Sequence, residues 1–156
     1  KVTTILNGGN TKVGIESTVI DISNKKTKIL RHGGISEESI NELIKIHKKE
    51  INIKVISPGL SHSHYKPDKP IRINATRPRE GEAWLAFGKK PDYFYGISLT
   101  LSEKKCLDES AKNLYKMLRL LDKKNVRSIA IQKIPKKGIG LAINDRLRRA
   151  AFIKDK

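Results

Sequence analysis

The sequence predicts an α/β protein built from two folded parts with an extended connector between them. In the second half, apolar segments of strand length alternate with stretches of helical periodicity. The order strand, helix, strand, helix is typical of a small parallel sheet with helices packed on it. Between the halves, residues 57–67 (SPGLSHSHYKP) show neither the alternation of a strand nor the periodicity of a helix. Each proline favours extended geometry in the residue before it.

The first part is predicted to hold short strands and tight turns. Residues 2–6 are expected to form a strand that ends in an Asn-Gly-Gly-Asn turn. Residues 13–22 form the next strand, and residues 27–31 return beside it as a hairpin partner. The alternation of the 13–22 strand divides its side chains between two faces, with Ser17, Val19 and Asp21 on one and Thr18, Ile20 and Ile22 on the other.

A helix is predicted to follow this hairpin. Ser36 can cap it, and Glu37 and Glu38 lie in the first turn, where the helix dipole favours negative charge. Residues 52–56 are expected to form a short strand that leads into the connector. The inward stripe of the helix is expected to be Ile40, Leu43, Ile44 and His47.

The second part opens with strands. Residues 71–74 are predicted to form a short edge strand. Residues 82–88 (EAWLAFG) are a continuous apolar run, which favours a strand buried on both faces. Residues 97–101 and 126–132 are two further strands.

Two helices complete the second part. The clearer one is expected to begin at Ser102, and a turn at 135–140 precedes the other, at about 141–152. The predicted inward residues are Leu107, Ala111, Leu114, Leu118 and Leu121 in the first helix, and Ile143, Leu147, Ala150 and Ala151 in the second.

Composition excludes several classes of protein. The single cysteine, Cys106, excludes an internal disulfide framework and suits a reducing compartment. No apolar run approaches the roughly 18 residues of a membrane span, and no signal peptide is recognised, so we expect a cytoplasmic protein without a membrane partner.

The chain is strongly basic, with 33 Lys and Arg against 16 Asp and Glu, for a net charge of +17. Residues 1–70 hold 12 basic and 7 acidic residues, and residues 71–156 hold 21 and 9. A basic second half indicates a polyanion such as RNA. The alternative is a compositional bias toward lysine that involves no ligand, and the sequence leaves both open.

A few residues could bind or react with ligands. Ser17 and Thr18 offer hydroxyls, but no base is placed to activate a serine nucleophile, so hydrogen bonding is expected. Arg31, before two glycines, could reach an anion or form a surface ion pair. His62 and His64 would point the same way from an extended chain, but no third ligand is near and metal binding is not expected.

The end of the chain offers two weaker signals. Gly138-Ile139-Gly140 before a helix could present backbone N–H groups to phosphate, although glycine turns are common. Arg146, Arg148 and Arg149 form a basic cluster suited to phosphate or to solvent. The connector itself is either a ligand-binding segment or a solvated hinge with incidental histidines.

Several blocks resemble one family, the two-domain branch of the L-threonylcarbamoyladenylate synthases. Residues 13–21 (VGIESTVID) with 29–35 (ILRHGGI) resemble the closing part of its YrdC-like domain. Residues 57–59 (SPG) with 64–67 (HYKP) resemble its linker. Residues 109–115 (ESAKNLY), 118–122 and 138–147 (GIGLAINDRL) resemble its Rossmann-like C-terminal domain.

The resemblance implies a fold and a reaction. It assigns residues 1–50 to the C-terminal part of a YrdC-like α/β domain and 51–80 to a linker and active-site lid. Residues 81–156 become a Rossmann-like α/β/α domain with a mainly parallel sheet. The family makes threonylcarbamoyl-AMP and pyrophosphate from threonine, bicarbonate or carbon dioxide, and ATP with Mg²⁺. This is the first step toward threonylcarbamoyladenosine in tRNA, before a downstream tRNA threonylcarbamoyl transferase.

The resemblance also implies ligand contacts. Ser17 and Thr18 would contact threonine, while Arg31, Tyr65, His64 and Gly59 would contact ATP. No catalytic residue and no protein-held metal is assigned.

This sequence departs from the family pattern in three ways. His32 stands where the family usually has proline, and residues 60–63 replace a Met-Lys-Tyr-basic run. The phosphate-gripping motifs of the family's N-terminal part have no counterpart in these blocks. We therefore expect the C-terminal portion of a longer enzyme, inactive alone, with a non-catalytic basic protein that binds tRNA or double-stranded RNA as the alternative.

Overall fold

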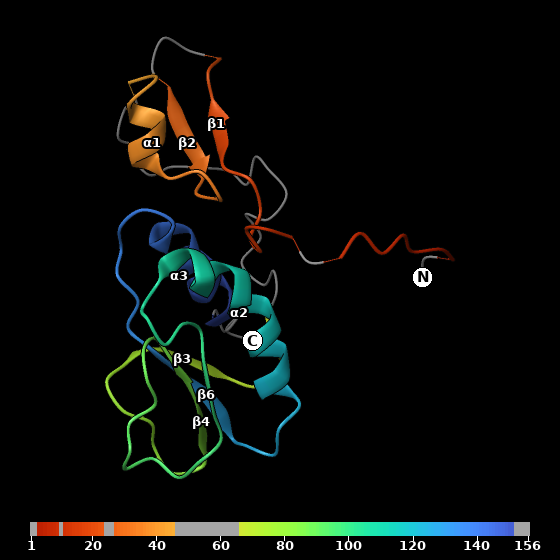
Figure 1. The fold of residues 1–156 in the computed structure, drawn as a ribbon, viewed down its shortest axis with the longest axis vertical. Coiled ribbons are helices and arrows are strands. Elements are labelled where there is room, and N and C mark those ends of the chain that lie inside the picture. The colour runs from red at the N-terminus through yellow and green to blue at the C-terminus, as the bar shows by residue number, and fades with distance from the viewer. Residues whose placement is uncertain (1–2, 10, 24–26, 46–65, 152–156) are drawn as a thin grey trace, which may run out of the picture.

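The structure, a computed structural model, describes residues 3–9, 11–23, 27–45 and 66–151. Figure 1 shows a hairpin with a short helix in its upper part and a larger sheet with two helices below. The predicted strand at 52–56 and most of the connector, 57–65, lie outside the described residues. No helix in the described ranges is long and apolar enough to cross a bilayer.

The larger sheet has four strands in the order β3-β6-β4-β5, and every neighbouring pair is parallel. The strands are β3 (Ile71–Ala75), β4 (Glu82–Ala86), β5 (Ser98–Thr100) and β6 (Ser128–Gln132). The predicted α/β class with a parallel sheet is confirmed. All five residues of β4 are buried, as expected for a strand covered on both faces, and β3 is an edge strand.

Both long helices pack on one face of this sheet. They are α2 (Leu107–Asp122) and α3 (Gly140–Ala151). Their apolar stripes meet alternate residues of β4 and β6 in the main core, whose buried members include Leu85, Ile131, Leu114, Leu118, Ile143 and Leu147. The predicted stripes are confirmed except at Ala151, which is only half-buried, because apolar residues at helical spacing need a facing surface and the sheet supplies it.

The opposite face of the sheet is covered differently from the prediction. A smaller cluster of Trp84, Ala75, Ala86 and Ala130 packs there against Phe94, which lies between β4 and β5. The α/β/α layering is therefore not formed by the described residues, which place helices on one face only. Small alanine side chains let a loop lie close enough to exclude water where a helix was expected.

Two predicted boundaries need correction. The helix expected from Ser102 begins at Leu107, after the N-cap residue Cys106, because the Ser102 side chain instead accepts a hydrogen bond from the Cys106 N–H at 3.0 Å. The last helix begins at Gly140. The boundary at residue 81 stays a prediction, although β3, inside the range assigned to the linker, is a strand of this sheet.

The hairpin is smaller than predicted. It pairs β1 (Val19–Asp21) with β2 (Lys28–Arg31) in antiparallel register, with Ile20 opposite Ile29. The strand expected at 2–6 is not formed by its described residues, where Ile5 and Leu6 are exposed. The strand expected at 13–22 is confined to β1. Ile5 and Leu6 have no facing surface to pack on among the described residues.

The short helix α1 (Glu37–Asn41) begins as predicted. The Ser36 side chain accepts a hydrogen bond from the Ser39 N–H at 3.2 Å. Its predicted stripe is wrong beyond Ile40, because the helix ends at Asn41 and Leu43 is 87% exposed. Ile44 is also exposed, and His47 lies outside the described residues.

Candidate functional site

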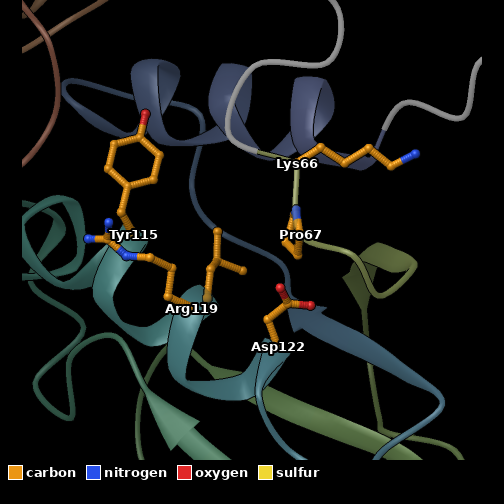
Figure 2. Close-up of a pocket in the computed structure, with 6 residues that line it drawn as sticks. Lys66, Pro67, Tyr115, Arg119 and Asp122 are labelled. Atoms are coloured by element: carbon orange, nitrogen blue, oxygen red, sulfur yellow. The ribbon is translucent and has the colours of Figure 1, made fainter. Parts of the chain in front are cut away.

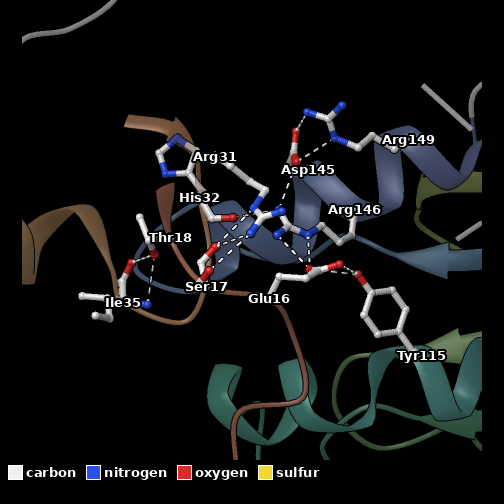
Figure 3. A network of polar contacts seen from close by, with 10 residues as sticks. All are labelled: Glu16, Ser17, Thr18, Arg31, His32, Ile35, Tyr115, Asp145, Arg146 and Arg149. Atoms are coloured by element: carbon white, nitrogen blue, oxygen red, sulfur yellow. Dashed lines mark hydrogen bonds and ion pairs between the residues drawn. The ribbon is translucent and has the colours of Figure 1, made fainter. Parts of the chain in front are cut away.

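Ser17 and Arg31 are brought together where the two hairpin strands meet. Arg31, the last residue of β2, donates from Nε and Nη2 to the Ser17 carbonyl oxygen at 3.2 and 3.1 Å. Nη2 also lies 3.3 Å from the Ser17 hydroxyl. Ser17 is exposed and Arg31 half-buried, so the guanidinium is oriented beside a hydroxyl that solvent can reach. The two residues predicted to contact different ligands are thus neighbours (Figure 3).

Thr18 has a different role in the structure. Its hydroxyl donates to the Ile35 carbonyl oxygen at 2.6 Å and accepts from the Ile35 N–H at 3.2 Å. These bonds close the 32–35 turn over β1. Contact between Thr18 and a ligand stays a prediction.

Gly33 makes the close approach of this turn possible. A Cβ added at Gly33 would lie 2.2 Å from the Ser17 carbonyl carbon and 2.3 Å from the Thr18 nitrogen. Any side chain would therefore displace the backbone that carries the candidate ligand contacts. The adjacent Gly34 N–H donates to the Glu16 carbonyl oxygen at 3.0 Å and fixes the other side of the turn.

The predicted basic cluster of α3 is mostly engaged within the protein. Arg146 is 3% exposed and forms an ion pair with Glu16 at 2.9 Å, and Asp145 lies 3.1 Å from its Nη1. Arg149 donates to Asp145 at 2.9 Å, while Arg148 is largely exposed. The interpretation of three arginines open to phosphate or solvent is therefore wrong for Arg146 and Arg149.

The charge of Arg146 is maintained by its partners. Burial acts against the charged form, but Glu16 and Asp145 outweigh it, and the pKa of the Arg146 guanidinium is raised. Tyr115 on α2 also donates to the Glu16 carboxylate at 3.3 Å. Sequence reasoning missed this network although a signal existed, since Arg146 follows the inward-facing Ile143 by three residues and so lies on the same side of α3.

The glycine turn before α3 is also occupied by a protein group. The Gly138 N–H donates to the Glu38 carboxylate at 3.2 Å. The backbone N–H groups of Glu38 itself and of Gly138 lower the pKa of this carboxyl. The turn predicted to offer its N–H groups to phosphate therefore already holds an acid from α1 at Gly138.

The end of the connector lies over a cavity beside α2. Lys66 and Pro67 line it together with Tyr115, Leu118, Arg119 and Asp122, and its volume is about 260 Å³ (Figure 2). The Asp122 carboxylate accepts from the backbone N–H groups of Asp68 and Lys69 at 3.2 and 3.0 Å. These bonds anchor the chain as it leaves the connector. Tyr65, His64 and Gly59, predicted to contact ATP, lie outside the described residues.

A second hollow of about 200 Å³ lies farther along α2 and shares Tyr115 and Arg119 with the first. Lys112, Lys116 and Arg119 project from one side of the helix at intervals of four and three residues, so the hollow is basic. Its other lining residues are Thr11, Gly14 and Asn113. The described residues contain no group of three or more His, Cys, Asp or Glu side chains that could hold a metal ion.

The fold and site define a class, namely a parallel α/β domain on which a hairpin with a serine–arginine pair is docked. A profile of the family described as "Threonylcarbamoyl-AMP synthase, C-terminal domain" matches residues 35–152. The chain belongs to the threonylcarbamoyl-AMP synthase family.

Curated relatives support the same family. The chain is 32% identical over 169 residues to threonylcarbamoyl-AMP synthase of Pyrococcus abyssi, an alignment that covers 97% of this chain and 50% of the relative. It is 34% identical over 167 residues to that of Bacillus subtilis, with 94% and 48% covered, and 30% identical over 193 residues to that of Schizosaccharomyces pombe, with 98% and 46% covered. The chain spans about half the length of the curated relatives it matches.

Two solved structures of the Pyrococcus abyssi Sua5 protein are similar to this one. The crystal structure complexed with L-threonine superposes with a TM-score of 0.75 at 29% identity, over 93% of this chain and 48% of that one. A variant with an adjacent histidine and tyrosine replaced by alanine gives a TM-score of 0.63 at 29% identity, over 93% and 45%.

Proposed function

We propose that this chain supplies the threonine- and ATP-contacting end of an L-threonylcarbamoyladenylate synthase. Its substrates would be threonine, bicarbonate or carbon dioxide, and ATP as its Mg²⁺ complex. Its products would be threonylcarbamoyl-AMP and pyrophosphate. The observation that carries the proposal is the Arg31 guanidinium held against Ser17, in a chain similar to a protein crystallised with L-threonine.

The proposed chemistry assigns each residue a binding role. The threonine amine and bicarbonate give a carbamate and water, and a carbamate oxygen then attacks the α-phosphorus of ATP and expels pyrophosphate. Ser17, with Thr18 beside it, hydrogen-bonds threonine. Arg31 offsets phosphate charge near the point where the carbamate must approach.

The connector is proposed to cover this site. Gly59, His64 and Tyr65 would lie over the nucleotide as a lid and limit hydrolysis of the carbamate and of the mixed anhydride. The Asp122 bonds to Asp68 and Lys69 support this, because they tether the end of the connector to α2. The product would pass to a tRNA threonylcarbamoyl transferase.

The complete reaction is proposed to need the half of the relatives' length that this chain does not span. The test is pyrophosphate release that depends on both threonine and bicarbonate, measured for the chain alone and for the chain mixed with the N-terminal half of the Bacillus subtilis relative. Activity is expected only in the mixture, and Arg31→Met is expected to abolish it. Release unaffected by Arg31→Met, or none in the mixture, would contradict the proposal.

A second candidate function is RNA binding, favoured by the basic hollow of α2. Lys112, Lys116 and Arg119 would contact the phosphate backbone of tRNA or double-stranded RNA. Binding to tRNA should weaken steeply between about 50 and 200 mM salt. Replacing all three residues with glutamine should make the affinity for tRNA less dependent on salt concentration. An unchanged salt dependence would show that this face of α2 does not bind RNA.

A further inference from the structure

Residues 14–16, here called the docking segment, join the hairpin to the helices of the larger sheet. Gly14 lies so close to α2 that an added Cβ would be 2.4 Å from the Lys112 Cα. Ile15 is half-buried and packs against the main core. Two consecutive residues thus contact the C-terminal domain immediately before Glu16 and Ser17.

Arg146 of α3 is the centre of this contact. Its Nη2 and Nε lie 2.9 and 3.0 Å from the Glu16 carboxylate, and its Nη1 donates to the His32 carbonyl oxygen at 2.7 Å. Glu16 directly precedes Ser17, and His32 directly follows Arg31. One buried guanidinium therefore holds the neighbours of both candidate ligand contacts (Figure 3).

We propose that Arg146 is a positioning residue, through which the C-terminal domain fixes the distance between the Ser17 hydroxyl and the Arg31 guanidinium. This proposal rests on the proposed function, in which those two groups contact threonine and ATP. It gives the C-terminal domain a definite task, which is to hold the closing part of the ligand site in the binding geometry.

The shape and burial of the guanidinium suit this task. Its planar fork directs several N–H groups at fixed angles, so it can hold the Glu16 carboxylate and the His32 carbonyl oxygen at once. A lysine ammonium group at this position would keep the positive charge but could not direct N–H groups at both partners in this fixed geometry. Burial of the Arg146 side chain, which is 3% exposed, adds rigidity, because moving either partner away would leave part of the buried guanidinium without an acceptor.

The hairpin offers little rigidity of its own. Among the described residues 3–9, 11–23 and 27–45, the buried ones are Gly33 and Ile40. The β1–β2 pair alone has too small an apolar face to fix its side chains, since isolated two-stranded hairpins are marginally stable in water. The contact with Arg146 supplies the missing constraint.

The experiment compares Arg146→Lys and Glu16→Gln with Arg148→Met as the matched control, since Arg148 is on the same helix but its side chain is 68% exposed. Amide hydrogen exchange is measured on the chain without substrates. The reporters are the Gly34 N–H, bonded to the Glu16 carbonyl, and the Ile35 N–H, bonded to the Thr18 hydroxyl. The exchange rates of both amides should rise about tenfold in Arg146→Lys and in Glu16→Gln, while the exchange rates of the β4 and β6 amides stay unchanged. In Arg148→Met all of these rates should equal those of the wild type.

Kinetics in the mixture with the relative's N-terminal half provide the second measurement. The KM values for threonine and for ATP should rise together, by about tenfold, in Arg146→Lys and stay unchanged in Arg148→Met. If Arg146→Lys lowers the melting temperature but leaves the Gly34 exchange rate and both KM values unchanged, Arg146 is merely structural and the proposal is overturned. If the wild-type mixture releases no pyrophosphate, the proposed function fails, whereas amide exchange still decides whether Arg146 holds the docking segment.

Discussion

Protonation of Glu82 should destabilise the larger sheet at acid pH. Glu82 opens β4, and its side chain is 8% exposed. It receives two hydrogen bonds from Arg72 across β6, at 3.0 Å and 2.5 Å, and one from the Arg79 N–H at 2.8 Å. The Ser128 hydroxyl donates a further bond at 3.2 Å. The carboxylate is thus surrounded by donors that favour its charged form.

The size of the effect follows from the pKa. The hydrogen bond from Arg72 is the main cause that lowers the pKa of Glu82 from 4.5 to about 2, against burial, which acts in the opposite direction. The folded chain therefore binds this proton less readily than the unfolded chain. The stabilisation is fully present above about pH 4.5, is lost as the pH falls through about 2, and amounts to about 3 kcal/mol at neutral pH.

The assay is urea unfolding of wild type and Glu82→Gln from pH 7 to pH 2.5, followed by the fluorescence of Trp84, the single tryptophan, which is buried in the same strand. Glutamine keeps an acceptor but cannot carry the charge. The free energies of unfolding of the two proteins should differ by about 3 kcal/mol at pH 7 and converge as the pH approaches 2.5. Glu80→Gln, at an exposed position, is the control, and its free energy of unfolding should differ little from that of the wild type at every pH. Parallel pH profiles for wild type and Glu82→Gln would refute the reasoning.

Three further outcomes are expected. Gly33→Ala should shift the amide resonances of Ser17 and Thr18 and reduce activity in the mixture, because its Cβ would overlap the Ser17 backbone; Gly8→Ala, with no atom within 4 Å of an added Cβ, should do neither. Leu114→Ala, at a fully buried position, should cost about 2–5 kcal/mol in urea unfolding, and Leu120→Ala, at a 41% exposed position, much less. Phe94→Ala should uncover Trp84 and move its fluorescence to longer wavelength, whereas Tyr95→Ala, at a 94% exposed side chain, should leave the spectrum unchanged.

The larger sheet was predictable because its elements carry their own signals. The apolar run of β4 and the apolar stripe of α2 indicate which faces of these elements are buried. The elements that cover those faces lie in the same half of the chain. The periodicity at residues 2–6 and beyond Ile40 of α1 predicted structure that is not formed. In those segments an apolar pattern specifies a face that needs a partner, and the described chain supplies none.

The candidate site was only partly predictable, for a related reason. Local sequence placed Ser17 and Arg31 on segments predicted to pair, and the structure brings the two residues together, although Ser17 precedes β1. Arg146 was interpreted as a surface cation because its partner Glu16 lies 130 residues earlier in the chain. Charge on an inward helical position indicates a buried pair, but only the fold reveals which acid completes it.

The docking segment explains how a poorly packed hairpin can hold Ser17 and Arg31, the candidate ligand contacts, in a fixed arrangement. Ile15 lies outside the residues 35–152 matched by the C-terminal family profile, yet it packs against the core of that domain. The core of the sheet and helices therefore extends under the hairpin, and Arg146 adds a directional bond at its edge. Apolar packing alone would hold the segment without fixing its rotation, because such contacts are non-directional. The ion pair and the His32 carbonyl bond set that rotation, and with it the orientation of Ser17 toward Arg31.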